Sequence, residues 1–158
     1  MGQSSNDVIP TTIHVAARMA VEKRLLPTLE ALADVLEERA EAFDAVVKTG
    51  RTHLQDATPI RLGQEFSGYA SQMTHGVERI EGIRASLSEL AIGGTALRTG
   101  LHTPPAFPPS VVQRPPEATG VPFRQADLHF EPPARPVAPL AATRAPQPFL
   151  LYSSHPAD

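Results

Sequence analysis

Three short stretches carry more hydrogen-bonding side chains than turns or helix ends require: QSSND at 3–7, GRTHLQD at 50–56 and GGTALRTG at 93–100. In the second stretch, His53 carries an imidazole, the side-chain type best suited to move a proton or orient a water near neutral pH, and Asp56 is a candidate to orient its ring. The first stretch precedes a predicted helix, where free backbone N–H groups favour an anion. Simple N-capping by Ser5 or Asn6 and an ordinary surface histidine remain open as alternatives.

Composition excludes several other kinds of site. The chain has no cysteine, so a disulfide framework and a cysteine-based metal site are excluded. The remaining histidines show no metal-ligand spacing, so we expect no metal; they are His14, His75, His102, His129 and His155. A formal net charge of −3 is too mild to indicate a nucleic-acid partner or an anionic membrane surface. No apolar run reaches the length of a membrane span, and the first residues lack the pattern of a secretory signal.

Apolar residues recur every three or four positions in two long stretches, which predicts two amphipathic helices. The first stripe is Leu25, Leu29, Leu32, Leu36, Ala40, Phe43 and Val47. The second is Leu62, Phe66, Tyr69, Met73, Val77, Ile80, Ile83, Leu87 and Leu90. The alternation of three and four is typical of the seam of a long helical bundle.

The first helix is predicted to begin between Val8 and Thr12 and to run to about Val47. Asn6 and Asp7 are candidate N-caps. Pro10 suits a first turn, whereas Pro27 must kink the helix or split it in two.

The GRTHLQD stretch is then predicted to connect the two helices. Gly50 suits the end of the first helix, and Thr58 with Pro59 suits the start of the second. The second helix tolerates Gly63, Gly68, Gly76 and Gly82, which predicts a close approach by neighbouring helices.

Proline divides the chain into two parts. Three of the 17 prolines precede residue 100, and the rest follow it. We therefore expect a helical-bundle segment at 1–100 and a proline-rich, degraded or disordered tail at 101–158 with little regular structure. The predicted fold class is all-α, a long-helix bundle with a proline-rich irregular C-terminal tail.

The length of the first helix constrains any shared site. If residues 10–47 form one helix, it spans about 55 Å at roughly 1.5 Å per residue. QSSND and THLQD would then lie at opposite ends. Either Pro27 folds the helix back, or the two stretches meet through different copies of the chain, which predicts a homo-oligomer.

Long motifs resemble the central helical domain of class II fumarases, in the fumarase and aspartase superfamily. They are GQSSNDVIPTTIHVAA, GRTHLQDATPIRLGQEFSGYA and ELAIGGTALRTGL. The resemblance covers residues 2 to about 101 and continues raggedly to Glu131. His53 favours a fumarase, because the ammonia-lyases acting on aspartate usually have glutamine at that place.

The resemblance implies reversible hydration of fumarate to L-malate by a homotetramer, with no metal and no organic cofactor. It implies that Ser4, Ser5, Asn6 and Thr52 bind a substrate carboxylate. His53 would be the proton donor and acceptor or the residue that positions water. A cytoplasmic location is expected, or the mitochondrial matrix in a eukaryote.

The chain also departs from the family pattern. Met1 falls inside that pattern, and the family's mobile loop with the catalytic serine has no counterpart at Ser153 and Ser154. Arg98, His102 and Pro104 replace the family's usual residues, and 132–158 resemble nothing in it. These departures lead to the hypothesis of a truncated or frame-altered gene product with little or no activity. A non-catalytic oligomerising helical chain and another lyase, such as an aspartate ammonia-lyase, are the alternatives.

Overall fold

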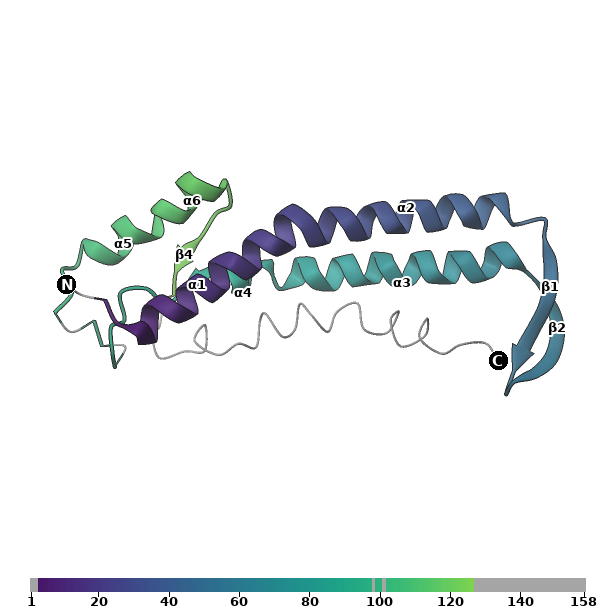
Figure 1. Cartoon of the computed structure of the whole chain (residues 1–158), viewed down its shortest axis with the longest axis horizontal. Helices are drawn as coiled ribbons and strands as arrows, with labels where there is room; N and C mark the ends of the chain where they lie inside the picture. The colour runs from purple at the N-terminus through teal and green to yellow at the C-terminus, as the bar shows by residue number, and fades with distance from the viewer. Residues whose placement is uncertain (1–2, 98, 101, 127–158) are drawn as a thin grey trace. The chain divides into compact units, whose positions relative to one another are not determined.

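The computed structural model describes residues 3–97, 99–100 and 102–126. These residues form two compact units (Figure 1). The hairpin unit is Leu26–Glu78. The two-segment unit combines the described residues up to Leu25 with those from Arg79 onward.

The two-segment unit begins with helix α1, Ser5–Ala20. The helix starts earlier than predicted, because Ser4 is the N-cap and not Asn6 or Asp7. Pro10 therefore lies inside the helix and not in its first turn. A proline inside a helix removes one backbone hydrogen bond, and here the helix continues through it.

A π-helical turn, η1, Val21–Leu25, follows α1 and leads directly into helix α2, Leu26–Ala42. Pro27 lies just beyond this turn. Its ring would clash with the carbonyl of Lys23 in regular α-helix, and it has no N–H to donate there. A π turn relieves this conflict by local widening. The predicted split at Pro27 is thus a change of helix type within continuous helical backbone.

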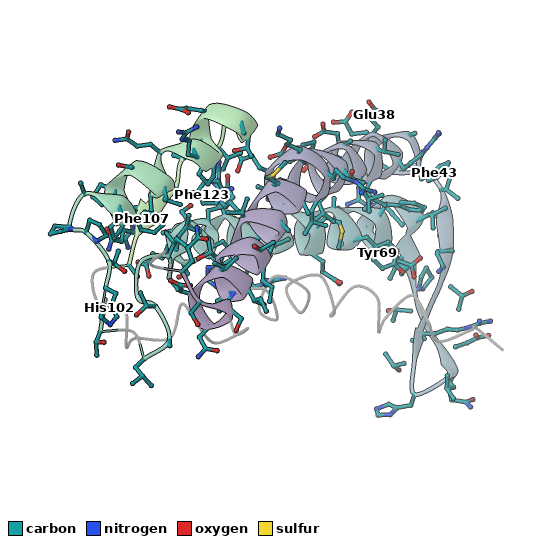
Figure 2. All side chains as sticks on the ribbon, turned by 60° about the vertical axis from the view of Figure 1, so that its left-hand side comes forward. Glu38, Phe43, Tyr69, His102, Phe107 and Phe123 are labelled. Atoms are coloured by element: carbon teal, nitrogen blue, oxygen red, sulfur yellow. The ribbon has the colours of Figure 1, made fainter. Side chains whose placement is uncertain are left out.

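The second segment of this unit contains short elements after helix α3, Leu62–Gly82. They are α4, Arg84–Leu87; β3, Glu89–Leu90; α5, Phe107–Val112; α6, Arg114–Thr119; and β4, Arg124–Gln125. Strands β3 and β4 pair in parallel, with Glu89 opposite Arg124. One cluster of its core consists of Leu90, Ile92 and Val112, with Val8, Val15, Val111 and Phe123 packed against it. Figure 2 shows Phe107 on α5 and Phe123 just before β4.

The proline-rich stretch is more regular than the sequence predicted. Helices α5 and α6 each carry proline in their first turn, where the missing N–H would have no partner anyway. Gly120 ends α6 with φ of 72°, the left-handed cap that glycine favours. The expectation of little regular structure is therefore wrong for 107–125. The expectation for 127–158 lies outside the described residues.

The hairpin unit contains α2, the hairpin of β1, Val47–Thr52, and β2, Gln55–Arg61, and most of α3. Helices α2 and α3 lie side by side, with the hairpin at one end (Figure 1). A Cβ on Gly63 would lie 2.3 Å from the carbonyl oxygen of Ala40, so the close approach predicted at this glycine is confirmed. At Gly68 and Gly82 a Cβ would meet nothing within 4 Å among the described residues, so no close approach occurs there within one chain.

Aromatic contacts and an ion pair stabilise the hairpin end of this unit. Phe43 and Phe66 pack with ring centroids 5.3 Å apart, and Phe66 meets Tyr69 at 6.1 Å; Figure 2 shows Phe43 and Tyr69. The ammonium of Lys48 on β1 donates to both carboxylate oxygens of Glu65 on α3, each at 2.7 Å. Aromatic packing thus joins the residues just after α2 to α3, and a charged hydrogen bond joins β1 to α3.

The predicted stripes are confirmed in part. Met73, Ile80, Leu87 and Leu90 of the second stripe are fully buried. In α2 the buried side chains are Leu26, Leu29 and Ala33, whereas Leu32 is exposed. The predicted all-α fold class with long helices is confirmed. Among the described residues, no helix is long and apolar enough to cross a membrane.

Candidate functional site

The Ser4–Asn6 segment forms the start of α1. Ser4 has extended backbone, and its Oγ accepts a hydrogen bond from the Asn6 backbone N–H at 3.2 Å. The side-chain amide of Asn6 donates to the carbonyl oxygen of Ala96 at 2.9 Å. Ser5 is exposed. The sequence left N-capping by Ser5 or Asn6 open. In the structure, the residue that caps α1 is Ser4.

Asp7 connects this segment to a second polar stretch. Its carboxylate accepts the backbone N–H groups of Ser4 at 2.9 Å, Gly93 at 3.3 Å and Thr95 at 3.0 Å. The side chain of Asp7 is 1% exposed. The structure therefore brings QSSND and GGTA together, although they are more than 80 residues apart in the sequence. Sequence reasoning singled out both stretches, but it considered Asp7 only as a helix cap.

An open hollow lies at this junction. Its volume is about 410 Å³, and its lining consists of Ser5, Asn6, Ile9, Pro10 and Ala96. A larger hollow of about 450 Å³ in the hairpin unit contains none of the predicted site residues. That second hollow is lined by Asp44 and Arg61, which are exposed and pair with each other at 2.9 Å. The first hollow is therefore the one that combines a helix start with candidate binding groups.

Thr52 and His53 lie at the tip of the hairpin and not in a loop between helices. Thr52 is opposite Gln55, and His53 with Leu54 makes the two-residue turn, with φ of 50° and 60°. Both residues in a type I′ turn need positive φ, which L-amino acids rarely adopt. Thr52 and His53 are exposed, and among the described residues no hydrogen bond to the imidazole is formed.

The strands beside the tip also differ from prediction. Asp56 accepts a hydrogen bond from Nε of Arg51 at 3.2 Å, so its partner here is Arg51 and not His53. Gly50 is a strand residue and not a helix stop, and a bulge there places it opposite two residues of β2. A Cβ on Gly50 would lie 2.7 Å from the carbonyl oxygen of Thr58. Thr58 and Pro59 belong to β2, so they do not start the second helix.

The predicted site residues thus fall into two groups. Ser4, Ser5 and Asn6 belong to the two-segment unit, whereas Thr52 and His53 belong to the hairpin unit.

Both groups fall within the part of the chain that matches known proteins. Residues 1–131 match a family model described as a lyase. The chain belongs to this lyase family.

Individual relatives of the chain carry more specific names. It is 60% identical over 130 residues to a class II fumarate hydratase of Halobacterium salinarum, covering 82% of this chain and 28% of the relative. It is 53% identical, with the same coverage, to a class II fumarate hydratase of Nitrosomonas europaea. The chain spans about 28% of the length of these curated relatives.

Solved structures agree with this assignment. A class II fumarase from Schistosoma mansoni superimposes with a TM-score of 0.78 and 31% identity, covering 99% of this chain and 38% of that chain. A fumarate lyase:delta crystallin from Brucella melitensis gives a TM-score of 0.81 and 28% identity, covering 96% of this chain and 33% of that chain. The resemblance to class II fumarases is thereby confirmed.

The chain also buries a histidine that sequence reasoning set aside. His14 on α1 is 3% exposed, and both its ring nitrogens are buried without a hydrogen-bond partner in the described structure. Burial lowers the pKa of His14 below 6.5, because it disfavours the charged ring. The carbonyl groups of Glu89 and Leu87 and the Glu89 carboxylate oppose this shift without overcoming it.

Charged groups near His14 are already engaged with one another. Arg18 donates to Ser88 Oγ at 3.1 Å and to Glu22. Arg84 donates to the other oxygen of Glu22 at 2.6 Å. Within the described residues, no group of three or more histidine and carboxylate side chains is arranged to hold a metal ion.

Proposed function

We propose that this chain contributes to a fumarate hydratase, which adds water reversibly to fumarate to give L-malate. The observation that carries the proposal is the 60% identity to a class II fumarate hydratase across a stretch of 130 residues. The exposed binding groups at the start of α1 support it, because they suit a dicarboxylate. The chain's cytoplasmic location stays a prediction.

The groups at the start of α1 have donors left for a ligand. The hydroxyl of Ser4 accepts one hydrogen bond, so its own O–H can still donate. Asn6 uses one of the two N–H bonds of its amide on Ala96. Ser5 is exposed. The N-terminus of α1 adds a partial positive charge, which favours a carboxylate.

The reaction needs such donors. In the direction from malate to fumarate, a proton leaves the carbon beside a carboxylate and hydroxide leaves the next carbon as water. The first step places a second negative charge on that carboxylate. Fixed neutral donors stabilise this developing charge, and we assign that role to Ser4, Ser5, Asn6 and Thr52. His53 is assigned the role of moving a proton or positioning the water.

We also propose that the chain forms a homo-oligomer, more specifically a tetramer, and that the complete site forms between its copies. The division of the candidate residues between two units supports this, since Thr52 and His53 lie on a separate unit from Ser4–Asn6. His53 makes no hydrogen bond within the described residues, so its ring is available to a neighbour.

Binding of dicarboxylates to the purified chain tests the proposal. Weak or absent turnover is expected of this chain alone, so affinity is measured by nuclear magnetic resonance and turnover by the absorbance of fumarate. Fumarate and L-malate are expected to bind, and Asn6→Ala to weaken both by about tenfold through the loss of one hydrogen bond. Ser71→Ala, an exposed serine on α3, is the control and should change neither.

Two results would contradict the proposal. One is binding of aspartate with release of ammonia but no binding of fumarate, which would favour an ammonia-lyase. The other is equal affinity for fumarate in the parent chain and the Asn6→Ala variant. A sizing column on the same samples tests the oligomer, which a monomer at all concentrations would contradict.

A further inference from the structure

The carboxylate of Asp7 is the most densely bonded buried side chain at the candidate site. It accepts three backbone N–H groups, one from its own helix start and two from the segment 93–95. A buried carboxylate is costly unless its oxygens are satisfied, and here three donors and the positive end of α1 satisfy it. Asp7 therefore binds two chain segments together through one charge.

The backbone at 93–95 has the shape that an anion requires. Gly93 has φ of 93° and Thr95 has φ of 59°, so two residues within three are left-handed. The N–H groups of Gly93 and Thr95 converge on one carboxylate oxygen and form an anion-binding concavity, whereas the N–H of Gly94 between them donates to the carbonyl oxygen of Ala91. In this chain the anion is the side chain of Asp7. Without it, the buried N–H groups of Gly93 and Thr95 would lose their partner.

The same turn also holds a predicted binding residue. The carbonyl oxygen of Ala96, one residue beyond Thr95, accepts the side-chain amide of Asn6. Ala96 and Asn6 both line the hollow of about 410 Å³. The location of the Asn6 amide thus depends on the turn, and the turn depends on Asp7.

We propose that Asp7 is a positioning residue for dicarboxylate binding. Its buried carboxylate fixes the Ser4–Asn6 segment to the Gly93–Ala96 turn, and so determines where Ser5 and Asn6 present their donors. Asp7 itself does not touch the ligand. The inference rests on the proposed function, because the ligand is the dicarboxylate proposed above.

Electrostatics and positioning predict opposite results for one substitution. Asp7→Asn removes a negative charge close to a site for a dianion, so charge alone predicts tighter binding of fumarate. Asparagine also keeps the size of the side chain, but its NH₂ group cannot accept an N–H. Positioning therefore predicts weaker binding. The sign of the change separates the two effects.

The first experiment measures fumarate affinity in the full chain by nuclear magnetic resonance titration, for the parent, for Asp7→Asn and for Asp34→Asn. Asp34 is exposed on α2, so its variant makes the same chemical change away from the hollow. We expect fumarate to bind about tenfold more weakly to the Asp7→Asn variant, the scale of one lost charged hydrogen bond. The control should bind like the parent.

The second experiment needs no variant, so it remains decisive if Asp7→Asn does not fold. Hydrogen exchange of the Gly93 and Thr95 amides is followed in the parent with and without saturating fumarate. By linkage, if ordering of the turn strengthens binding, then binding must order the turn. We expect exchange at these two amides to slow, while amides of α2 stay unchanged.

The outcomes separate this inference from the proposed function. If the parent binds fumarate and Asp7→Asn binds it equally or more tightly, the inference is overturned and the proposed function stands. Unchanged exchange at Gly93 and Thr95 on saturation also overturns it. If the parent binds no dicarboxylate while these amides remain protected, the proposed function fails and Asp7 has only a structural role.

Discussion

The Ser4–Asn6 segment lies at a helix start that buried hydrogen bonds hold, whereas Thr52 and His53 lie at an exposed hairpin tip. Asp7 ties the first region to the Gly93–Ala96 turn through three backbone N–H groups. At the tip, the nearest ion pair joins Arg51 and Asp56, which are 64% and 74% exposed. Exposed ion pairs contribute little to stability, so mainly the turn itself determines the location of His53.

This contrast teaches that the two groups of candidate residues are positioned by different means. The helix start is organised by hydrogen bonds within its own unit, so these contacts need no neighbouring copy. The tip holds two non-glycine residues at positive φ, a strain that proteins retain mostly at functional positions. Under the proposal above, a neighbouring copy of the chain completes the site at this tip.

The largest loss of stability is expected from Gly93→Ala, because Gly93 lies in the turn that binds Asp7. A Cβ there would lie 2.4 Å from Cγ of Pro108, and the residue has φ of 93°. Strain and overpacking together should lower the free energy of unfolding by about 2–4 kcal/mol. Urea unfolding followed by circular dichroism measures this.

Gly120→Ala is the matched control for that variant. Gly120 has φ of 72°, but a Cβ there meets nothing within 4 Å. Its cost should therefore be the backbone strain alone, about 1 kcal/mol. Equal losses in the two variants would mean that the Gly93 turn is not closely packed.

A smaller effect is expected from Ser4→Ala, which removes the cap of α1. Loss of a serine cap costs about 0.5–2 kcal/mol of unfolding free energy. Ser5→Ala is the control, because Ser5 is exposed and the cap at Ser4 stays intact. Thermal unfolding of both variants checks the prediction, and an equal loss for Ser5→Ala would contradict the assignment of the cap.

At the hairpin tip, Leu54→Gly should raise stability slightly. Leu54 has φ of 60° and is 95% exposed, so glycine relieves strain while losing no packing. The gain should be about 0.5 kcal/mol, because the greater freedom of glycine when unfolded offsets part of it. Leu97→Gly, at an exposed leucine without positive φ, should be neutral or destabilising. Destabilisation by Leu54→Gly would indicate that the tip is not strained.

The smallest effect on stability is expected from the protonation of His14 in the two-segment unit. Burial lowers the pKa of folded His14 below 6.5, against the opposing influence of Glu89 and Leu87. The unfolded chain then binds more protons, so stability should be complete above pH 6.5 and decrease as pH falls toward the lower folded pKa. Arg18, Arg84, Glu22 and Glu89 are the charged groups around this helix face.

His14→Gln should remove that part of the pH dependence. Urea midpoints between pH 5 and pH 8 are compared for the parent, His14→Gln and the control His75→Gln, which changes an exposed histidine on α3. The control should follow the parent. If His14→Gln also follows the parent, folding does not depend on the proton of His14.

Much of the helical structure could be predicted from the sequence, but the hairpin could not. The helical period located the buried positions Met73 and Ile80 on α3 and Leu87 on α4 correctly, whereas Leu90 is buried on strand β3 and not on a helix. Strands reveal themselves by alternating buried and exposed residues, and nearly every residue of β2 is exposed. The hairpin therefore left no periodic signal, and Gly50 and Pro59 were interpreted as marks of helix ends.

The sequence by itself determined the family, the long helices and the candidate groups, because these depend on local period and on residue types that survive as motifs. Only the tertiary structure decided that Asp7 joins the start of α1 to the Gly93–Ala96 turn, and that His53 lies on a strained hairpin. The physical reason is that backbone N–H groups carry no sequence signature. Which acceptor satisfies them is determined when distant segments pack, as Gly93 and Thr95 do against Asp7.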